Sequence, residues 1–194
     1  MRFLLFRIKE KLFKIGKAWD KCAVCKECAV EFAEKYINQE PDRTLKDNPF
    51  VYTMEYVLAS SAESINERWR SDCASDEDHR IASALDKYCT SSPIVVYRGV
   101  CEHVYECMVA NAKGIKGVDL LEKGFMSTSL VKGCEIPYDI KLRIYIPYGN
   151  KCVFMGDVNY ELETYYEVAV QRHARLKIIS IDEKYINCLL IGTA

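Results

Sequence analysis

The chain has 194 residues, of which 49% are hydrophobic and 28% are charged. This apolar content is enough for one well-buried core and leaves little for a second. The 27 lysines and arginines nearly balance the 28 aspartates and glutamates, so the chain lacks the global basic field that is typical of nucleic-acid-binding proteins. We therefore expect one globular domain and find no strong nucleic-acid signal in the composition.

Residues 1–22 predict an amphipathic basic helix. Their apolar side chains recur at alternating steps of three and four, which places them on one helical face. These are Leu5, Ile8, Leu12, Ile15, Trp19 and Cys22, and the remaining faces carry Arg2, Arg7, Lys9, Lys11, Lys14 and Lys17. Arg7 and Lys9 interrupt the apolar run too early for a secretory signal or a membrane span. Two interpretations stay open: a helix packed on the domain, which Trp19 favours, or a helix lying on an anionic membrane surface.

The chain contains ten cysteines. Cys22, Cys25 and Cys28 form a cluster whose spacing is half of many zinc sites. No second Cys-x-x-Cys and no histidine pair at a matching distance completes it, so we expect no metal. Others, such as Cys101 and Cys152, lie in apolar-periodic segments where a free thiol acts as a small hydrophobe. We therefore expect reduced thiols and a protein that works in cytosol.

Helical signals continue to about residue 90 and recur once afterwards. Ser75 and Asp78 have the spacing of a capping box at the start of one such helix. The helical segments are predicted over residues 48–69, 75–89 and 101–114.

After Pro93 the period changes to that of strands. Residues 139–147 alternate strictly, with Ile140, Leu142 and Ile144 facing one way, so they predict a half-buried strand. The strands are predicted over residues 93–100, 139–147, 151–156, 167–170, 176–181 and 185–192. Helices first, followed by a mostly antiparallel β core, is α+β organisation.

Arg98 and Gly99 stand together at the end of the first predicted strand. A guanidinium can grip phosphate oxygens through two parallel hydrogen bonds, and a glycine lets a ligand approach the main chain closely. The pair therefore suits a diphosphate ligand.

Three hydroxyl residues in a row, Ser127, Thr128 and Ser129, follow in the stretch EKGFMSTSLV. Such runs at turns usually make local backbone hydrogen bonds. Further on, Glu167 opens a predicted strand after an acidic, tyrosine-rich loop. A carboxylate near a ribose could stabilise the oxocarbenium-like charge that forms when a glycosidic bond breaks. The hydroxyls could orient that carboxylate and the sugar.

Taken in order, Arg98-Gly99, GFMSTSL, IPYGNKCVFMGDVN and YYEVAVQRHARLKI resemble the Arg-Ser-Glu class of bacterial mono-ADP-ribosyltransferase toxins. This class includes the clostridial Rho-modifying exoenzymes and related binary toxins, and the resemblance covers roughly residues 45–185. It implies an α+β fold in which N-terminal helices precede a mostly antiparallel β core of two sheets. Residues 1–42 would be a helical segment and residues 43–194 the catalytic domain.

The resemblance also implies roles for individual residues. Arg98 would bind the phosphates of NAD, Ser127 would brace the site, and Glu167 would contact the nicotinamide ribose. The backbone of Gly99 would hold the carboxamide. Glu163 is the second candidate for the catalytic carboxylate, since Glu161 and Glu163 also have Glu-x-Glu spacing, but only Glu167 precedes a strand of the expected type. The wider NAD-binding set is Arg98, Gly99, Phe125, Ser127, Thr128 and Ser129.

Members of this family commonly carry glutamate or glutamine two residues before the catalytic glutamate, where this chain has Tyr165. The acceptor therefore stays open among arginine, asparagine and a nonprotein group. The loop over residues 157–166 would contact the target, through Tyr160, Tyr165 and Tyr166.

The activity that the resemblance implies is NAD-dependent mono-ADP-ribosyl transfer to a target macromolecule, a host protein, with NAD as substrate and without a metal. The alternatives are an NAD glycohydrolase, in which water is the acceptor, and a catalytically silent binding module. A toxin of this kind would be a secreted effector that acts in host cytosol without a conventional signal peptide. The alternative is a protein that stays in the cytoplasm of the cell that makes it.

Overall fold

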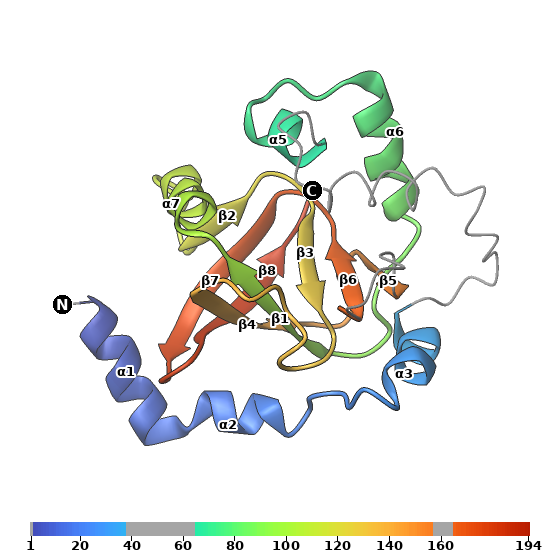
Figure 1. Ribbon diagram of the computed structural model, residues 1–194. Coiled ribbons are helices and arrows are strands. Elements are labelled where there is room, and N and C mark those ends of the chain that lie inside the picture. The colour runs from blue at the N-terminus through green and yellow to red at the C-terminus, as the bar shows by residue number, and fades with distance from the viewer. Residues whose placement is uncertain (1, 38–64, 157–164) are drawn as a thin grey trace.

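The computed structural model describes residues 2–37, 65–156 and 165–194 (Figure 1). The helix predicted over residues 48–69 falls largely outside this part of the chain, as does the domain boundary predicted at residues 42 and 43. The described helices are α1 (Arg2–Phe13), α2 (Ile15–Asp20), α3 (Ala29–Tyr36), α5 (Ile65–Arg70), α6 (Asp76–Leu85) and α7 (Glu102–Asn111). Within the described ranges, no helix combines the length and the apolar character that crossing a membrane requires.

In the described part of the chain, eight strands follow the helices of the first part, and α7 is the one helix between them. They are β1 (Ile94–Val100), β2 (Leu120–Glu122), β3 (Met126–Ser129), β4 (Ile140–Ile146), β5 (Cys152–Gly156), β6 (Glu167–Val170), β7 (Ala174–Ile181) and β8 (Ile186–Gly192). The α+β prediction of helices followed by a mostly antiparallel β core is confirmed.

The strands pair in the order β2-β7-β8-β4-β1-β3-β6-β5, and every pair is antiparallel except β4 with β8. The division into two sheets is not confirmed, because pairing runs through one mixed eight-stranded sheet. Its centre is a narrow seam. β1 pairs with β4 along its whole length, but with β3 only where Tyr97 faces Ser129. The two halves of the sheet can therefore diverge at the seam, where the end of β1 stays open on one side.

Strand β4 shows how the alternating pattern builds the core. Leu142, Ile144 and Ile146 are fully buried, as predicted, in the main apolar cluster. The opposite face is covered as well, since Arg143 is buried and forms an ion pair with Asp20 at the end of α2. The strand is therefore covered on both faces rather than half-buried.

A second, smaller core lies beneath α5 and α6. The capping box predicted at Ser75 is present, with the Ser75 hydroxyl accepting from the Asp78 N–H and the Asp78 carboxylate accepting from the Ser75 N–H. Asp78 is fully buried and also accepts two hydrogen bonds from Arg68 of α5. The cap of α6 therefore holds α5 in place. In Figure 1 the two helices lie on the side of the sheet opposite α1, α2 and α3.

The N-terminal helix differs from the prediction in two respects. Lys14 adopts a left-handed conformation, with φ 48°, and this breaks the predicted helix into α1 and α2. On α1, Phe6 is the buried apolar side chain, whereas Leu5 and Leu12 of the predicted face remain 55% and 70% exposed.

Packing of α1 on the domain is nevertheless confirmed, because Phe6 joins the main core. The Glu10 carboxylate accepts hydrogen bonds from the side chains of Ser180 and Asn187 on β7 and β8. One buried ring and one carboxylate thus dock the helix and leave its predicted apolar face to solvent.

Candidate functional site

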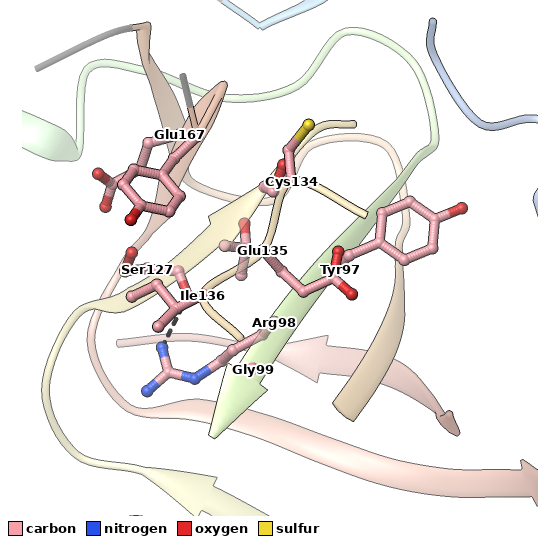
Figure 2. Close-up of a pocket in the computed structure, with 11 residues that line it drawn as sticks. Tyr97, Arg98, Gly99, Ser127, Cys134, Glu135, Ile136 and Glu167 are labelled. Atoms are coloured by element: carbon pink, nitrogen blue, oxygen red, sulfur yellow. Dashed lines mark hydrogen bonds between the residues drawn. The ribbon is translucent and has the colours of Figure 1, made fainter. Parts of the chain in front are cut away.

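The three candidate residues Arg98, Ser127 and Glu167 line one pocket (Figure 2). They come from β1, β3 and β6, which are neighbours in the sheet. The register explains the meeting, since Ser129 lies opposite both Tyr97 of β1 and Glu167 of β6. Arg98 follows Tyr97 directly, and Ser127 lies two residues before Ser129. Residues separated by up to 69 positions in the sequence are thus brought to one short row at the seam.

The Arg98 guanidinium is buried and held in a fixed orientation. One terminal nitrogen, Nη1, donates to the Ser127 carbonyl at 2.9 Å, and the other, Nη2, donates to Glu122 Oε2 at 3.1 Å. Burial lowers the pKa of Arg98, an effect that Glu122 opposes, but a guanidinium stays charged in proteins. Its Nε has no hydrogen-bond partner within the described part of the chain. The group therefore keeps donor capacity for a ligand.

Glu122 binds Arg98 beside the pocket and also binds Arg70, and the sequence analysis identified neither residue. The buried Glu122 carboxylate accepts from Arg98 and also from Nε and Nη2 of Arg70, each at 3.1 Å. Arg70 is partly exposed, and although burial lowers its pKa, the adjacent carboxylates of Glu122 and Glu67 raise it overall. Two cations share the buried Glu122 carboxylate, and Arg70 also pairs with Glu67 at 2.6 Å. The pairing spans 24 and 52 residues, and no local pattern signals it.

Glu167 is the opposite case, a buried carboxylate without a full set of partners. Its side chain is 2% exposed, and Oε1 has no hydrogen-bond partner among the described residues. Burial raises the pKa of Glu167 to about 7, against the opposing effects of the Ser127 hydroxyl and the Arg98 charge. Buried groups with strongly perturbed pKa values gather at functional sites.

The three hydroxyls of the Ser-Thr-Ser run have different environments. Thr128 Oγ1 donates to the Val168 carbonyl at 2.7 Å, and Ser129 Oγ bonds the backbone of Val131. These two make the local backbone bonds that are usual for such residues. Ser127 is the one whose hydroxyl acts on Glu167. Thr128 and Ser129 also line the pocket, and their contact with a ligand stays a prediction.

Gly99 lines the pocket, and a tight approach of two backbone segments requires its missing side chain. A Cβ at this position would lie 1.8 Å from the carbonyl oxygen of Ile136. Phe125, in contrast, does not line the pocket. It is fully buried in the small core with Ile65 and Trp69, so its position indicates a packing role rather than NAD binding.

The predicted target-contacting tyrosines are only partly described. Tyr165 lines the pocket, two residues before Glu167. Tyr166 packs against the main core, and its carbonyl accepts from the Leu130 N–H at 2.9 Å. Tyr160 and Glu163 lie outside the described residues.

Within the described part of the chain, no group of three or more histidine, cysteine, aspartate or glutamate side chains is placed to hold a metal ion. All ten cysteines have free thiols. The charged side chains that line the pocket are those of Arg98, Glu135 and Glu167. Glu122 and Arg70 do not line it, but Glu122 binds the Arg98 guanidinium from behind the lining and binds Arg70 as well.

A family model described as ADP-ribosyltransferase exoenzyme matches residues 53–190. No curated protein matches the chain.

Among solved structures, C3stau2 from S. aureus with NAD has 17% sequence identity and a TM-score of 0.65, covering 88% of this chain and 97% of that one. Plx2a, an ADP-ribosyltransferase toxin from Paenibacillus larvae, has 17% identity and a TM-score of 0.62, covering 88% and 98%. The Clostridium limosum C3 exoenzyme has 16% identity and a TM-score of 0.61, covering 84% and 93%. At these identities the structural likeness shows the fold.

The unpaired carboxylate predicts a pH-dependent stability. The folded chain holds the Glu167 proton with a pKa of about 7, compared with an ordinary value of 4.5. This group's contribution to stability is therefore complete below about pH 4.5 and is lost as the pH rises through 7. Glu167→Gln removes that loss, so the variant should be more stable than the wild type at pH 8 by about 2–3 kcal/mol. Urea denaturation at pH 8 and pH 4.5 measures it.

The matched control is Glu122→Gln, a change of the same size at another buried glutamate. It removes the charge that holds Arg98 and Arg70, so it should destabilise the chain by about 3 kcal/mol at pH 8. If the stability of Glu167→Gln relative to the wild type is the same at both pH values, the raised pKa of Glu167 is contradicted.

Proposed function

The chain belongs to the ADP-ribosyltransferase exoenzyme family, and on that premise we propose that its pocket binds NAD and transfers ADP-ribose to a protein through Arg98, Ser127 and Glu167. The observation that carries the proposal is the buried Glu167 carboxylate, whose Oε1 has no hydrogen-bond partner among the described residues, in the same pocket as a buried guanidinium. Such a carboxylate is costly for the folded state, and an electron-poor ligand offsets that cost.

The free N–H donors of the two guanidinium groups suit the diphosphate of NAD. A guanidinium has five N–H donors, and Arg98 uses two of them within the protein. Arg70 is the more exposed of the two arginines, and Glu122 fixes its orientation. Phosphate oxygens that accept from these donors would anchor NAD while its ribose extends toward Glu167. Because Arg98 bonds the Ser127 carbonyl, the phosphate anchor and the carboxylate are held in one frame.

The reaction breaks the bond between the nicotinamide nitrogen and ribose C1′. The bonding electron pair leaves with nicotinamide, which becomes neutral, and C1′ gains oxocarbenium-like positive charge. The ionised Glu167 carboxylate stabilises this charge and can accept a hydrogen bond from a ribose hydroxyl. Ser127 orients the carboxylate. An acceptor nucleophile then forms a bond to C1′ and loses its proton to solvent.

Removing the Glu167 charge tests this role. Glu167→Gln should lower the rate of transfer at least about 100-fold, because one electrostatic stabiliser of the transition state is lost. NAD affinity should change only a few-fold, since the arginines remain. Labelled NAD measures transfer, and calorimetric titration measures binding. In the wild-type enzyme, kcat/KM should rise with pH and level off above about 7, where Glu167 is ionised.

Two results would oppose this assignment. One is a Glu167→Gln variant with wild-type transfer. The other is label that stays in free ADP-ribose when host lysate is supplied, which would favour NAD glycohydrolase activity with water as the acceptor. A stable complex with a protein but no NAD binding would favour the silent binding module.

We further propose that the acceptor is a side chain of a host protein and that it approaches along Tyr165. Tyr165 lines the pocket and precedes Glu167 by two residues, where family members commonly carry glutamate or glutamine. The free thiols of the chain suit a reducing host cytosol, which supports an effector that acts there. The target protein and the acceptor residue are best identified by mass spectrometry of host proteins after reaction.

If Tyr165 guides the acceptor, its removal should affect transfer to protein more than it affects NAD hydrolysis. Tyr165→Ala should reduce transfer to protein by about 10-fold or more, because an interface aromatic side chain is lost. NAD hydrolysis should stay within about three-fold, since Glu167 and the arginines are intact. The control is Tyr148→Ala, which removes a tyrosine that is 70% exposed in the turn after β4. A parallel fall of both activities in Tyr165→Ala would indicate a role in NAD binding instead.

We also propose that residues 1–22 bring the domain to an anionic membrane surface. Six large apolar side chains of α1 are 43–70% exposed, and basic residues lie between them in the sequence. They are Phe3, Leu4, Leu5, Ile8, Leu12 and Phe13. Exposed apolar side chains interleaved with lysines are typical of helices that lie in a membrane interface.

Flotation of the full chain with vesicles tests the apolar contact. The wild type should float with vesicles of phosphatidylcholine and phosphatidylserine, and Leu12→Ser with Phe13→Ser should weaken binding about 10-fold or more. Both side chains are about 70% exposed, so the fold should tolerate the change. The control is Val109→Ser, at an exposed apolar residue of α7. Equal flotation of the wild type and the double variant would contradict the proposal.

A further inference from the structure

A groove of about 880 Å³ lies between the N-terminal helices and the turn that joins β7 to β8. In Figure 1, α1 and α2 run beside the ends of these two strands. Among the described residues, none lines both the groove and the pocket of Arg98 and Glu167. The groove is lined by both apolar and basic side chains. Its lining comprises Leu4, Arg7, Ile8, Glu10, Lys11, Lys14, Lys17, Asp20, Lys132, Arg143, Ile181, Asp182, Glu183, Lys184 and Tyr185.

Most carboxylates that line the groove already accept hydrogen bonds from other groups of the chain. Glu10 accepts from the side chains of β7 and β8 and from the Gly16 N–H. Asp20 accepts from the Tyr97 hydroxyl and pairs with Arg143. Asp182 accepts from Arg143 and from two backbone N–H groups of its own turn. Three of the four acids therefore serve the fold, and Glu183 is the remaining one.

Most cations of the groove, unlike its carboxylates, are not paired within the described part of the chain. Arg143 and Lys132 pair with Asp20. The other five have no carboxylate partner within the described part of the chain, so the groove holds five uncommitted cations against one uncommitted acid. They are Arg7, Lys11, Lys14, Lys17 and Lys184. A concave surface with this excess of one charge attracts a ligand that carries several negative charges.

The backbone conformation of Lys14 brings lysines of α1 and α2 to the same groove. Lys14 adopts φ 48° and ψ 42°, a left-handed conformation that is unfavourable for a residue with a Cβ. The break that it makes lets α1 and α2 bend around the groove, so that Lys11 and Lys17 line the same space. A glycine would adopt this backbone without strain. Strain that is kept at a lysine points to a use for its ammonium group.

Apolar side chains at the groove's edge indicate where the anion is attached. Leu4 and Ile8 line the groove and belong to the exposed apolar set of α1. When those side chains enter a bilayer, the groove opens at the depth of the lipid headgroups. We propose that the groove binds the phosphorylated headgroup of an anionic membrane lipid, with two or more phosphates spread over its lysines. This inference rests on the membrane contact proposed above and deepens it from surface charge to headgroup selection.

Vesicle cosedimentation of the full chain tests the proposal. One vesicle set contains phosphatidylcholine with phosphatidylinositol 4,5-bisphosphate, and the other contains phosphatidylcholine with phosphatidylserine at the same surface charge. The wild type should bind the first set at least 10-fold more tightly. Lys17→Glu should remove most of this preference. Lys21→Glu, at an exposed lysine that caps the same helix outside the groove, should keep it. Transfer activity in solution should be equal in both variants, which shows that they fold.

Lys14→Gly adds a readout that a merely structural role would not give. It should raise the urea midpoint or leave it unchanged, because strain is relieved, and still reduce headgroup preference about three-fold or more. A lower urea midpoint together with unchanged preference would overturn a binding role for Lys14.

The possible failures are distinguishable. Equal binding to both vesicle sets would overturn the groove and leave the apolar membrane contact standing. Loss of binding to both sets would overturn the membrane proposal and this inference together. Binding of soluble inositol hexakisphosphate without vesicle binding would overturn the lipid as the source of the phosphates. Equal effects of Lys17→Glu and Lys21→Glu would show that surface charge, not the groove, governs association.

Discussion

The buried ion pair between Arg98 and Glu122 is the contact on which the site depends. A guanidinium enclosed at the seam of a sheet is tolerated only when a partner carboxylate is enclosed with it, because an unpaired buried charge is strongly unfavourable. Glu122 meets that condition and also binds Arg70. One carboxylate at the end of β2 therefore joins this strand to strand β1 and to helix α5. The same carboxylate fixes the orientation of both guanidinium groups, of which Arg98 lines the pocket.

Glu167 gives the site its second property. It lies near Arg98 but lacks the partners that Glu122 has, so burial dominates and raises its pKa to about 7. Two buried glutamates of one chain thus have opposite environments, since Glu122 is a paired counterion and Glu167 is the carboxylate for which we propose a catalytic role. Pairs of like groups in unlike environments are a common way for a fold to divide chemical roles.

Strand β1 also links the pocket to the other functional surface. Arg98 serves the pocket, and its neighbour Tyr97 donates a hydrogen bond to Asp20 of α2 at 3.0 Å. Asp20 and Arg143 in turn form part of the wall of the basic groove. Strand β1 therefore connects the pocket to the wall of the proposed membrane-facing groove. Under that proposal, the orientation of the domain on a bilayer would fix the direction in which the pocket opens.

Local patterns in the sequence determined the strand β4, the capping box of α6 and the order of Arg98, Ser127 and Glu167, because periodicity, caps and motifs involve neighbours along the chain. Only the tertiary structure decided that Glu122 and Arg70 complete the site, that Phe125 belongs to the core, and that Lys14 breaks the first helix. It also decided that a single Tyr97–Ser129 pair joins the halves of one sheet. These features depend on charges and backbones that meet across 24 to 52 residues or on docking against other elements, and spacing along the chain contains no record of such meetings.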